Sequence, residues 1–312
     1  MPIPLTGEQH EISAGDYTAV VTELGAGLRE LRHAGRPLLV GYQATELPPG
    51  AAGQLLIPWP NRVDGGRYTF DGKQLQLDLS EPPAGNAIHG LTRWLNWSAA
   101  EHEAGRVLMR HVLLGRTGYP FCLVLEAEYR LDPSDGLRLQ VTARNEGSTR
   151  APYGTGQHPY LTAGTEHIDE CELTLPATHW LPSGDRGIPS GPPEKVAGTP
   201  YDFRTPRAVG DVRLDHALTG LQRDAGGRAW VTLARPVKGE GEAVAGTRLW
   251  VGRGYRWLQV FSGDVLPAPQ RRRALAVEPM TCPPNAFVTG NDLLVLEPGD
   301  TVQQAWGARA IA

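Results

Sequence analysis

Two strand-like runs lie close together at Phe121-Cys-Leu-Val-Leu-Glu-Ala-Glu-Tyr-Arg-Leu131 and Leu137-Arg-Leu-Gln-Val-Thr-Ala-Arg-Asn145, separated by Asp132-Pro-Ser-Asp-Gly136. The second run alternates apolar and polar side chains, which is the period of a strand with one buried face. The intervening segment is rich in turn-forming residues, so we expect a β-hairpin with a five-residue loop. This pair therefore predicts an antiparallel fold.

The rest of the chain repeats this pattern of short strands and turns. Tyr68-Thr-Phe-Asp-Gly-Lys-Gln-Leu-Gln-Leu-Asp-Leu79 places Asp71-Gly72 between alternating runs, a strong hairpin signal. Further strands are expected at residues 17–24, 106–114, 247–251 and 257–261. No long stretch has a helical period, although a short helix is expected around 214–221. The spacing predicts an all-β, antiparallel sandwich rather than alternating strands and helices.

The glycines and prolines are spread along the chain rather than gathered in a tail. There are 38 Gly and 27 Pro among 312 residues, which favours many turns over disorder. Residues 182–206 are the longest Gly/Pro-rich stretch and are expected to form a loop at the rim of a cleft. Residues 240–246 resemble a second loop. Neither is a convincing boundary, so we expect one domain over residues 1–312.

Charge and composition exclude several classes of protein. The formal net charge is −4, so no global basic field favours nucleic acid or membrane surfaces. No window resembles a secretory signal or a membrane-spanning helix. The three cysteines, Cys122, Cys171 and Cys282, lack the pattern of a disulfide framework or zinc site, and Cys122 and Cys171 are expected to be buried thiols. A cytoplasmic protein fits these features best.

Four short motifs place ionisable side chains beside Gly or Pro in apolar surroundings. They are Pro60-Asn61-Arg62, Asn86-Ala-Ile-His89-Gly90, Gly156-Gln-His158-Pro-Tyr160 and Ala276-Val-Glu278-Pro279. Together they supply two imidazoles, one carboxylate and one guanidinium. This set suits proton transfer on a neutral substrate rich in hydroxyl groups.

Each of these residues also has a purely structural interpretation. His158 and His89 could be hydrogen-bonded structural histidines, and Arg62 could form a salt bridge that fixes its loop. Glu278 ends an apolar run, so it is either a structural ion pair or a carboxylate whose burial raises its pKa toward the range of a general base. Asp215 is more readily explained as a helix N-cap.

Other chemistries lack support in the sequence. There is no glycine-rich phosphate loop, no His-Glu-x-x-His and no Gly-x-Ser-x-Gly. His89, His158 and Glu278 could form a two-histidine, one-carboxylate metal site, but no His-x-His pair supports such a centre. We therefore expect neither a metal nor a cofactor.

In order and spacing, these motifs resemble the sugar site of the aldose 1-epimerase (galactose mutarotase) family across essentially the whole chain. Glu278-Pro-Met-Thr-Cys-Pro-Pro-Asn-Ala-Phe287 and Leu214-Asp-His-Ala-Leu-Thr-Gly-Leu221 look like the corresponding segments of a bacterial branch. The resemblance implies a β-supersandwich of the galactose mutarotase type. The motif around His158 departs from that of the best-known mutarotases, which leaves the preferred sugar open.

The resemblance also implies roles for individual residues. His158 would be the general acid and Glu278 the general base, with His89 beside the ring oxygen or orienting the substrate. Asn61, Arg62 and Asp215 would hold sugar hydroxyls. The implied substrate is a free aldohexose, and the oligomeric state stays open between monomer and homodimer.

Three alternatives remain at this point. A hexose-6-phosphate 1-epimerase could use Arg271-Arg272-Arg273 to bind phosphate, although three adjacent arginines cannot all face one site. A non-catalytic carbohydrate-binding or sensor protein would have no need for an acid–base pair. A metal-dependent isomerase would be sensitive to chelators.

Overall fold

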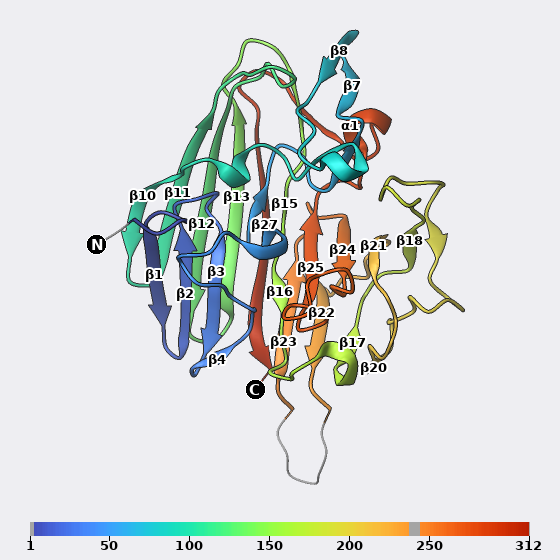
Figure 1. Cartoon of the computed structure of the whole chain (residues 1–312). Helices are drawn as coiled ribbons and strands as arrows, with labels where there is room; N and C mark the ends of the chain where they lie inside the picture. The colour runs from blue at the N-terminus through green and yellow to red at the C-terminus, as the bar shows by residue number, and fades with distance from the viewer. Residues whose placement is uncertain (1–2, 237–243, 312) are drawn as a thin grey trace.

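The chain folds into antiparallel β-sheets arranged in layers (Figure 1). The computed structural model describes residues 3–236 and 244–311. Every pairing between named strands in these ranges is antiparallel, as the sequence predicts. The main hydrophobic cluster takes buried residues from all three larger sheets, among them Leu31, Leu125 and Val260.

A nine-stranded sheet forms the back of the molecule in Figure 1. Its strands are, in spatial order, β10 (Ser98–Glu103), β11 (Arg106–Leu113), β12 (Leu123–Asp132), β13 (Gly136–Asn145), β27 (Thr301–Ile311), β23 (Gly246–Val251), β22 (Ala229–Ala234), β17 (Glu172–Thr174) and β20 (Arg207–Ala208).

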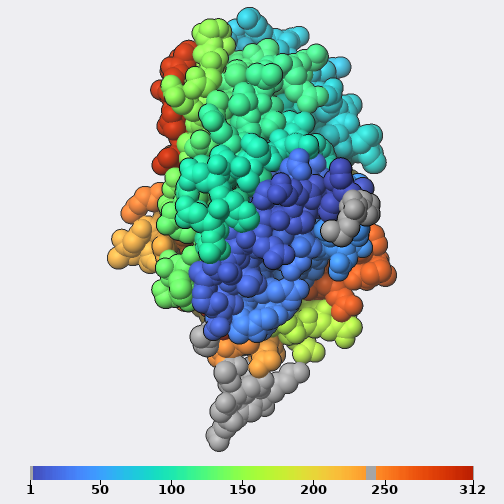
Figure 2. All heavy atoms as spheres, turned by 90° about the vertical axis from the view of Figure 1, so that its left-hand side faces the viewer, coloured from blue at the N-terminus to red at the C-terminus, as the bar shows by residue number. Residues whose placement is uncertain are grey.

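Two smaller sheets lie in front of it. A four-stranded sheet contains β1 (Gln9–Ala14), β2 (Tyr17–Thr22), β3 (Leu28–His33) and β4 (Arg36–Pro37). It packs on the green strands of the large sheet, as the side view also shows (Figure 2). An eight-stranded sheet contains β19 (Glu194–Lys195), β18 (His179–Leu181), β21 (Asp215–Thr219), β24 (Trp257–Phe261), β25 (Leu275–Met280), β15 (Gly156–Gln157) and β5 (Leu55–Leu56), with β16 (Tyr160–Leu161) also paired to β25.

Short elements complete the fold. The two-stranded pairs are β6 (Arg62–Asp64) with β9 (Asn86–Ile88), β7 (Arg67–Phe70) with β8 (Lys73–Gln76), and β14 (Ala151–Tyr153) with β26 (Leu294–Leu296). The helical segments are η1 (Pro49–Ala51), η2 (Pro82–Ala84), η3 (Thr92–Trp94), η4 (Ile168–Glu170) and α1 (Ala286–Thr289). In the described ranges, none of these helices has the length and apolar character needed to cross a membrane.

Both predicted hairpins form, with one difference in loop length. Asp71 and Gly72 join β7 to β8 with φ of 50° and 74°, the conformation of a type I′ turn. In the β12–β13 hairpin Asp132 already pairs with Gly136, so the loop has three residues rather than the five expected. The Asp132 carboxylate explains the tighter loop, because it accepts hydrogen bonds from the backbone N–H groups of Ser134 and Asp135.

Two other expectations need correction. The helix expected around 214–221 is wrong: Asp215–Thr219 is strand β21, paired on both sides, so Asp215 is no helix N-cap. Cys171 is buried as expected, whereas Cys122 is partly exposed. The long 182–206 segment is a loop apart from β19, whereas residues 240–243 of the second expected loop lie outside the described residues.

Candidate active site

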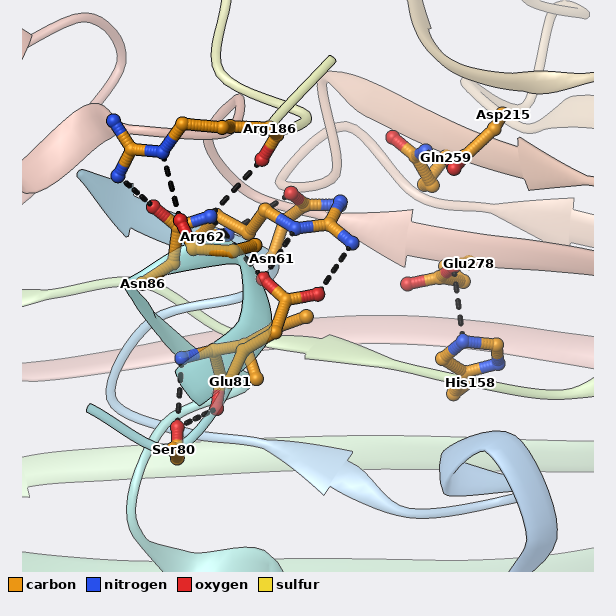
Figure 3. A network of polar contacts seen from close by, with 12 residues as sticks. Asn61, Arg62, Ser80, Glu81, Asn86, His158, Arg186, Asp215, Gln259 and Glu278 are labelled. Carbon is orange, nitrogen blue, oxygen red and sulfur yellow. Dashed lines mark hydrogen bonds and ion pairs between the residues drawn. The ribbon is translucent and has the colours of Figure 1, made fainter. Parts of the chain in front are cut away.

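The candidate site lies on one face of the eight-stranded sheet. Glu278 on β25 pairs across the ladder with Gln259 on β24, which in turn pairs with Ala217 on β21. Asp215 lies two residues before Ala217 and therefore on the same face of β21. The Gln259 side-chain amide donates a 2.7 Å hydrogen bond to the Asp215 carboxylate (Figure 3). Adjacent strands thus bring two carboxyl groups and an amide together from distant parts of the sequence.

His158 lies at the junction between β15 and β16, which both pair with β25. Its backbone is held by two hydrogen bonds, from its N–H to the Gln54 carbonyl at 3.2 Å and from the Gly53 N–H to its own carbonyl at 2.8 Å. Its Nε2 atom lies 3.2 Å from Oε1 of Glu278 (Figure 3), and the Tyr160 ring stacks on the imidazole at 4.9 Å between centroids. The ring is therefore fixed on one side and faces the carboxyl group on the other.

His89 and Asn61 approach the site in an uncommon backbone conformation. Their φ values are 62° and 54°, and the His89 N–H donates a 2.8 Å hydrogen bond to the Asn61 carbonyl. A third left-handed residue, Asn285 at φ 66°, donates its N–H to the Arg62 carbonyl at 2.7 Å. Such conformations cost energy in residues other than glycine and often cluster at functional sites. Here they bring the His89 ring edge-on to the His158 ring, 5.6 Å between centroids.

Arg62 forms the salt bridge that the sequence left as one of two interpretations. Its Nε and Nη2 atoms each donate a 2.8 Å hydrogen bond to the Glu81 carboxylate, a bidentate arrangement. Burial alone would lower the pKa of Arg62, but the hydrogen bonds and charge of Glu81 more than offset this and raise it. The guanidinium is therefore a fixed positive charge at the edge of the site.

Burial dominates the electrostatics of the acid–base residues. Glu278 is 2% exposed, and this desolvation, helped by the charge of Asp215, holds the pKa of its carboxyl group well above the usual range. Burial lowers the pKa of His158 to about 3, and burial together with the neighbouring His158 lowers the pKa of His89. Both shifts favour a state in which Glu278 keeps its proton and the two imidazoles stay neutral. Burial thus favours the uncharged form of each of the two catalytic candidates.

The structure brings together all six residues singled out from the sequence and adds others. Asn61 contributes less than expected through its side chain, since its Oδ1 accepts the Arg62 N–H at 2.9 Å. Gln259 and Glu81 were missed. Gln259 could have been noticed as the one polar residue in Trp257-Leu-Gln-Val-Phe261, whereas nothing local marks Glu81 as the partner of Arg62.

A narrow pocket beside Glu278 is lined by Asn61, Arg62, Leu181, Ser183, Gly187, Pro189, Asp215, Ala217, Gln259 and Pro284.

The same groups could in principle hold a cation. His89, His158 and Glu278 each offer a ligand atom, and these atoms lie within 4.8 Å of one another. Two imidazoles and one carboxylate form a ligand set known for divalent metals. The arrangement can therefore serve proton transfer or metal binding.

Comparison with known proteins identifies the family. The family model for aldose 1-epimerase matches residues 8–306. The chain belongs to the aldose 1-epimerase family. The uncharacterized protein YihR of Escherichia coli is 35% identical over 294 residues, covering 94% of this chain and 90% of YihR. The aldose 1-epimerase of E. coli is 28% identical over 210 residues, covering 65% of this chain and 58% of that enzyme.

Other members of the family match over a shorter range or by fold alone. Rat galactose mutarotase is 32% identical over 170 residues, so the match spans about half of each protein. The crystal structure of a GalM/aldose epimerase homologue from C. elegans has a TM-score of 0.82 at 18% identity and covers 98% of this chain and 99% of that one. The expected β-supersandwich of the galactose mutarotase type is thereby confirmed.

Proposed function

We propose that this protein is an aldose 1-epimerase that interconverts the α and β anomers of a free aldohexose. The observation that carries the proposal is the buried contact between His158 and Glu278, whose Nε2 and Oε1 atoms lie 3.2 Å apart. Mutarotation needs one group to take a proton from the anomeric hydroxyl and another to give a proton to the ring oxygen. A paired carboxyl and imidazole group can do both.

The pair holds one transferable proton, which is the number that the reaction needs. Transfer of this proton from Glu278 to His158 gives a carboxylate and an imidazolium. The carboxylate then takes the O1 proton while the imidazolium protonates the ring oxygen, and the C1–O5 bond breaks to leave the open-chain aldehyde. Rotation about C1–C2 and the reverse transfers close the ring on the other face, so protons and charges balance.

The remaining polar groups suit a sugar ring bound beside this pair. Asp215 and Gln259 are held together by their own hydrogen bond, and Arg62 is fixed by Glu81. In the proposed complex these groups bind ring hydroxyls and fix the distance between C1 and the His158–Glu278 pair. Positioning of this kind converts binding energy into rate. His89 is proposed to orient the ring from the edge of the His158 imidazole.

Contacts of the three-arginine run favour a free sugar over a sugar phosphate. Arg272 bonds to the carboxylates of Asp169 and Asp264 at 2.6 and 2.9 Å, and Arg273 lies 3.4 Å from a Glu166 carboxylate oxygen. Guanidinium groups already paired with carboxylates gain less from a phosphate, because an existing ion pair must be broken. We therefore propose an unphosphorylated substrate.

The first experiment follows the optical rotation of freshly dissolved α-D-glucose and α-D-galactose with and without the purified protein. Faster approach to the same equilibrium rotation is expected for at least one sugar. His158→Ala and Glu278→Gln are expected to abolish the acceleration, because each removes one partner of the proton exchange. Wild-type turnover in either variant would refute the assigned roles.

Matched controls come from outside the site. His10 is also buried, and Glu128 is a half-buried carboxylate paired with Arg106 on the large sheet, so His10→Ala and Glu128→Gln should leave turnover unchanged. Loss of activity with a chelator and its return with a divalent metal would favour the metal-dependent isomerase. Tight binding of a sugar without acceleration would favour a binding protein.

A further inference from the structure

One nitrogen of the Arg62 guanidinium remains open. Glu81 occupies Nε and Nη2, while Nη1 has no hydrogen-bond partner among residues 3–236 and 244–311. In Figure 3 the guanidinium points toward the side of the site where Gln259, Asp215 and Glu278 lie. Arg62 also lines the pocket together with Asp215 and Gln259. Nη1 is therefore the Arg62 nitrogen whose two N–H groups are both free to donate to a sugar hydroxyl.

Residues 182–190, here called the tip, lie next to this atom. The tip folds on itself through hydrogen bonds from Gly184 N–H to the Ile188 carbonyl at 3.0 Å and from Ser190 N–H to the Pro182 carbonyl at 2.9 Å. Three of its residues line the pocket opposite the sheet: Ser183, Gly187 and Pro189. The tip is thus held together by its own hydrogen bonds and forms the side of the proposed sugar pocket that faces the sheet.

Gly187 lies directly against the Arg62 guanidinium. A Cβ atom built on it would lie 2.5 Å from Nη1, 2.8 Å from Cζ and 3.0 Å from Nε of Arg62. Its φ of 69° also suits glycine better than other residues. Any side chain here would press on the guanidinium and cover its open nitrogen.

Arg186 anchors the tip to residues 84–86, just before His89, and to Asp64 of β6. Its guanidinium donates to the Ala84 carbonyl at 2.7 Å and to the Asn86 side chain at 3.0 Å, and pairs with Asp64 at 2.8 Å. In return, the Asn86 amide donates to the Arg186 backbone carbonyl at 3.0 Å (Figure 3). Hydrogen bonds in both directions between Arg186 and residues 84–86 therefore fix the position of the tip over Arg62.

The space beneath the tip is small. The pocket volume is about 10 Å³, which is room for about one water molecule. A sugar ring does not fit in this volume, so in the proposed complex the tip lies farther from the sheet than it does here. The contact between Gly187 and Arg62 is therefore expected to affect the complex with the sugar as well as the free protein.

We propose that Gly187 and Arg186 are positioning residues for the sugar. Gly187 keeps Nη1 of Arg62 open to one ring hydroxyl, and Arg186 holds the tip in the place where this is possible. The proposal rests on the proposed function, because it assigns a hydroxyl contact to the same sugar site. It adds that the glycine at 187 determines affinity for the sugar without taking part in the proton transfers.

The test compares KM and kcat for mutarotation by Gly187→Ala and by Gly198→Ala. Gly198 lies in the same long loop with φ of 79° and nothing within 4 Å of an added Cβ, so it shares the backbone strain but not the contact with Arg62. For Gly187→Ala we expect KM to rise about tenfold or more with a smaller fall in kcat, the effect of losing one hydrogen bond from a charged donor. An equal KM in both variants, or a change confined to kcat, would overturn the proposal.

Monodeoxy sugars identify the hydroxyl concerned. The aldose that lacks the hydroxyl bound by Nη1 should bind wild type and Gly187→Ala equally, whereas the other deoxy sugars should keep the difference between the two proteins. A penalty that persists undiminished with every deoxy sugar would show that the substitution acts in another way.

Arg186→Ala provides a second route if Gly187→Ala fails to fold. Its loss should also raise KM, whereas Arg204→Ala, which breaks a similar ion pair with Asp202 farther along the loop, should not. An unchanged KM in Arg186→Ala would count against the proposal. Calorimetric titration with the aldose gives the same comparisons without catalysis. Failure of the positioning role can thus be separated from failure of the proposed reaction.

Discussion

At the scale of single residues, the proposed chemistry depends on how His158 and Glu278 share a proton. Burial lowers the pKa of His158 and raises that of Glu278, so the form of the pair with one proton is favoured over a wide pH range. A second proton binds only at low pH, and the last proton leaves only when Glu278 ionises. We expect a bell-shaped dependence of kcat/KM on pH whose acid limb lies below 6.5, the ordinary pKa of histidine.

Polarimetry from pH 4 to 9, corrected for the spontaneous reaction in each buffer, measures this profile. Acceleration that halves near pH 6.5 on the acid side would mean that His158 titrates as in water. That outcome would contradict the effect of burial on the pair. Because the pair is coupled, the two limbs belong to the pair and not to either residue alone.

Sequence alone identified the residues whose neighbours are unusual and missed those whose partners are distant. His158 and Glu278 lie close to Gly or Pro within apolar runs, and this pattern can be recognised in the amino-acid sequence. The roles of Glu81 and Gln259 become clear only when β6 meets the residue before η2 and when β24 lies next to β25. The same holds for the pKa of His158, because its desolvation depends on the layers around it.

At the scale of elements, the β7–β8 hairpin offers a direct test of turn chemistry. Gly72 adopts φ of 74°, and an added Cβ would meet nothing within 4 Å, so any cost of Gly72→Ala is conformational. We expect a loss of about 1–2 kcal/mol in the free energy of unfolding, measured by urea denaturation. Gly184→Ala is the control, since its surroundings are equally open and its φ is not positive. Equal losses in the two variants would contradict this explanation.

The hairpins were predictable because their turn residues lie next to each other in the sequence. Strand β21 was not, because Leu214-Asp-His-Ala-Leu218 has apolar residues four apart, as a helix would, while its strand state comes from pairing with β18 and β24. Likewise the tip could be recognised as a loop, but its position over Arg62 depends on contacts of Arg186 with residues about 100 positions away.

At the scale of the whole molecule, packed sheets place many histidines away from water. Burial is the leading cause of a lowered pKa in five of them: His10, His89, His111, His158 and His216. An unfolded histidine binds a proton below pH 6.5, whereas these folded histidines bind one only at lower pH. Acidification below pH 6.5 therefore favours the unfolded chain. Glu278 acts in the opposite direction, since its raised pKa stabilises the fold as the pH falls toward 4.5.

As the pH falls, the five histidines lower the stability of the fold and Glu278 raises it. We therefore predict a net loss of stability between pH 6.5 and 5, before the carboxylates that form ion pairs begin to protonate. Each fully buried histidine contributes at most about 1.4 kcal/mol per pH unit in this window. Urea denaturation at pH 7.5, 6.5 and 5.5 measures the slope, and His10→Gln should make it shallower because His10 is buried outside the candidate site. A free energy of unfolding that stayed constant or rose from pH 7.5 to 5.5 would show that the buried histidines take up protons in the folded state. The same result would contradict the neutral state of His158, which the proton-sharing pair requires.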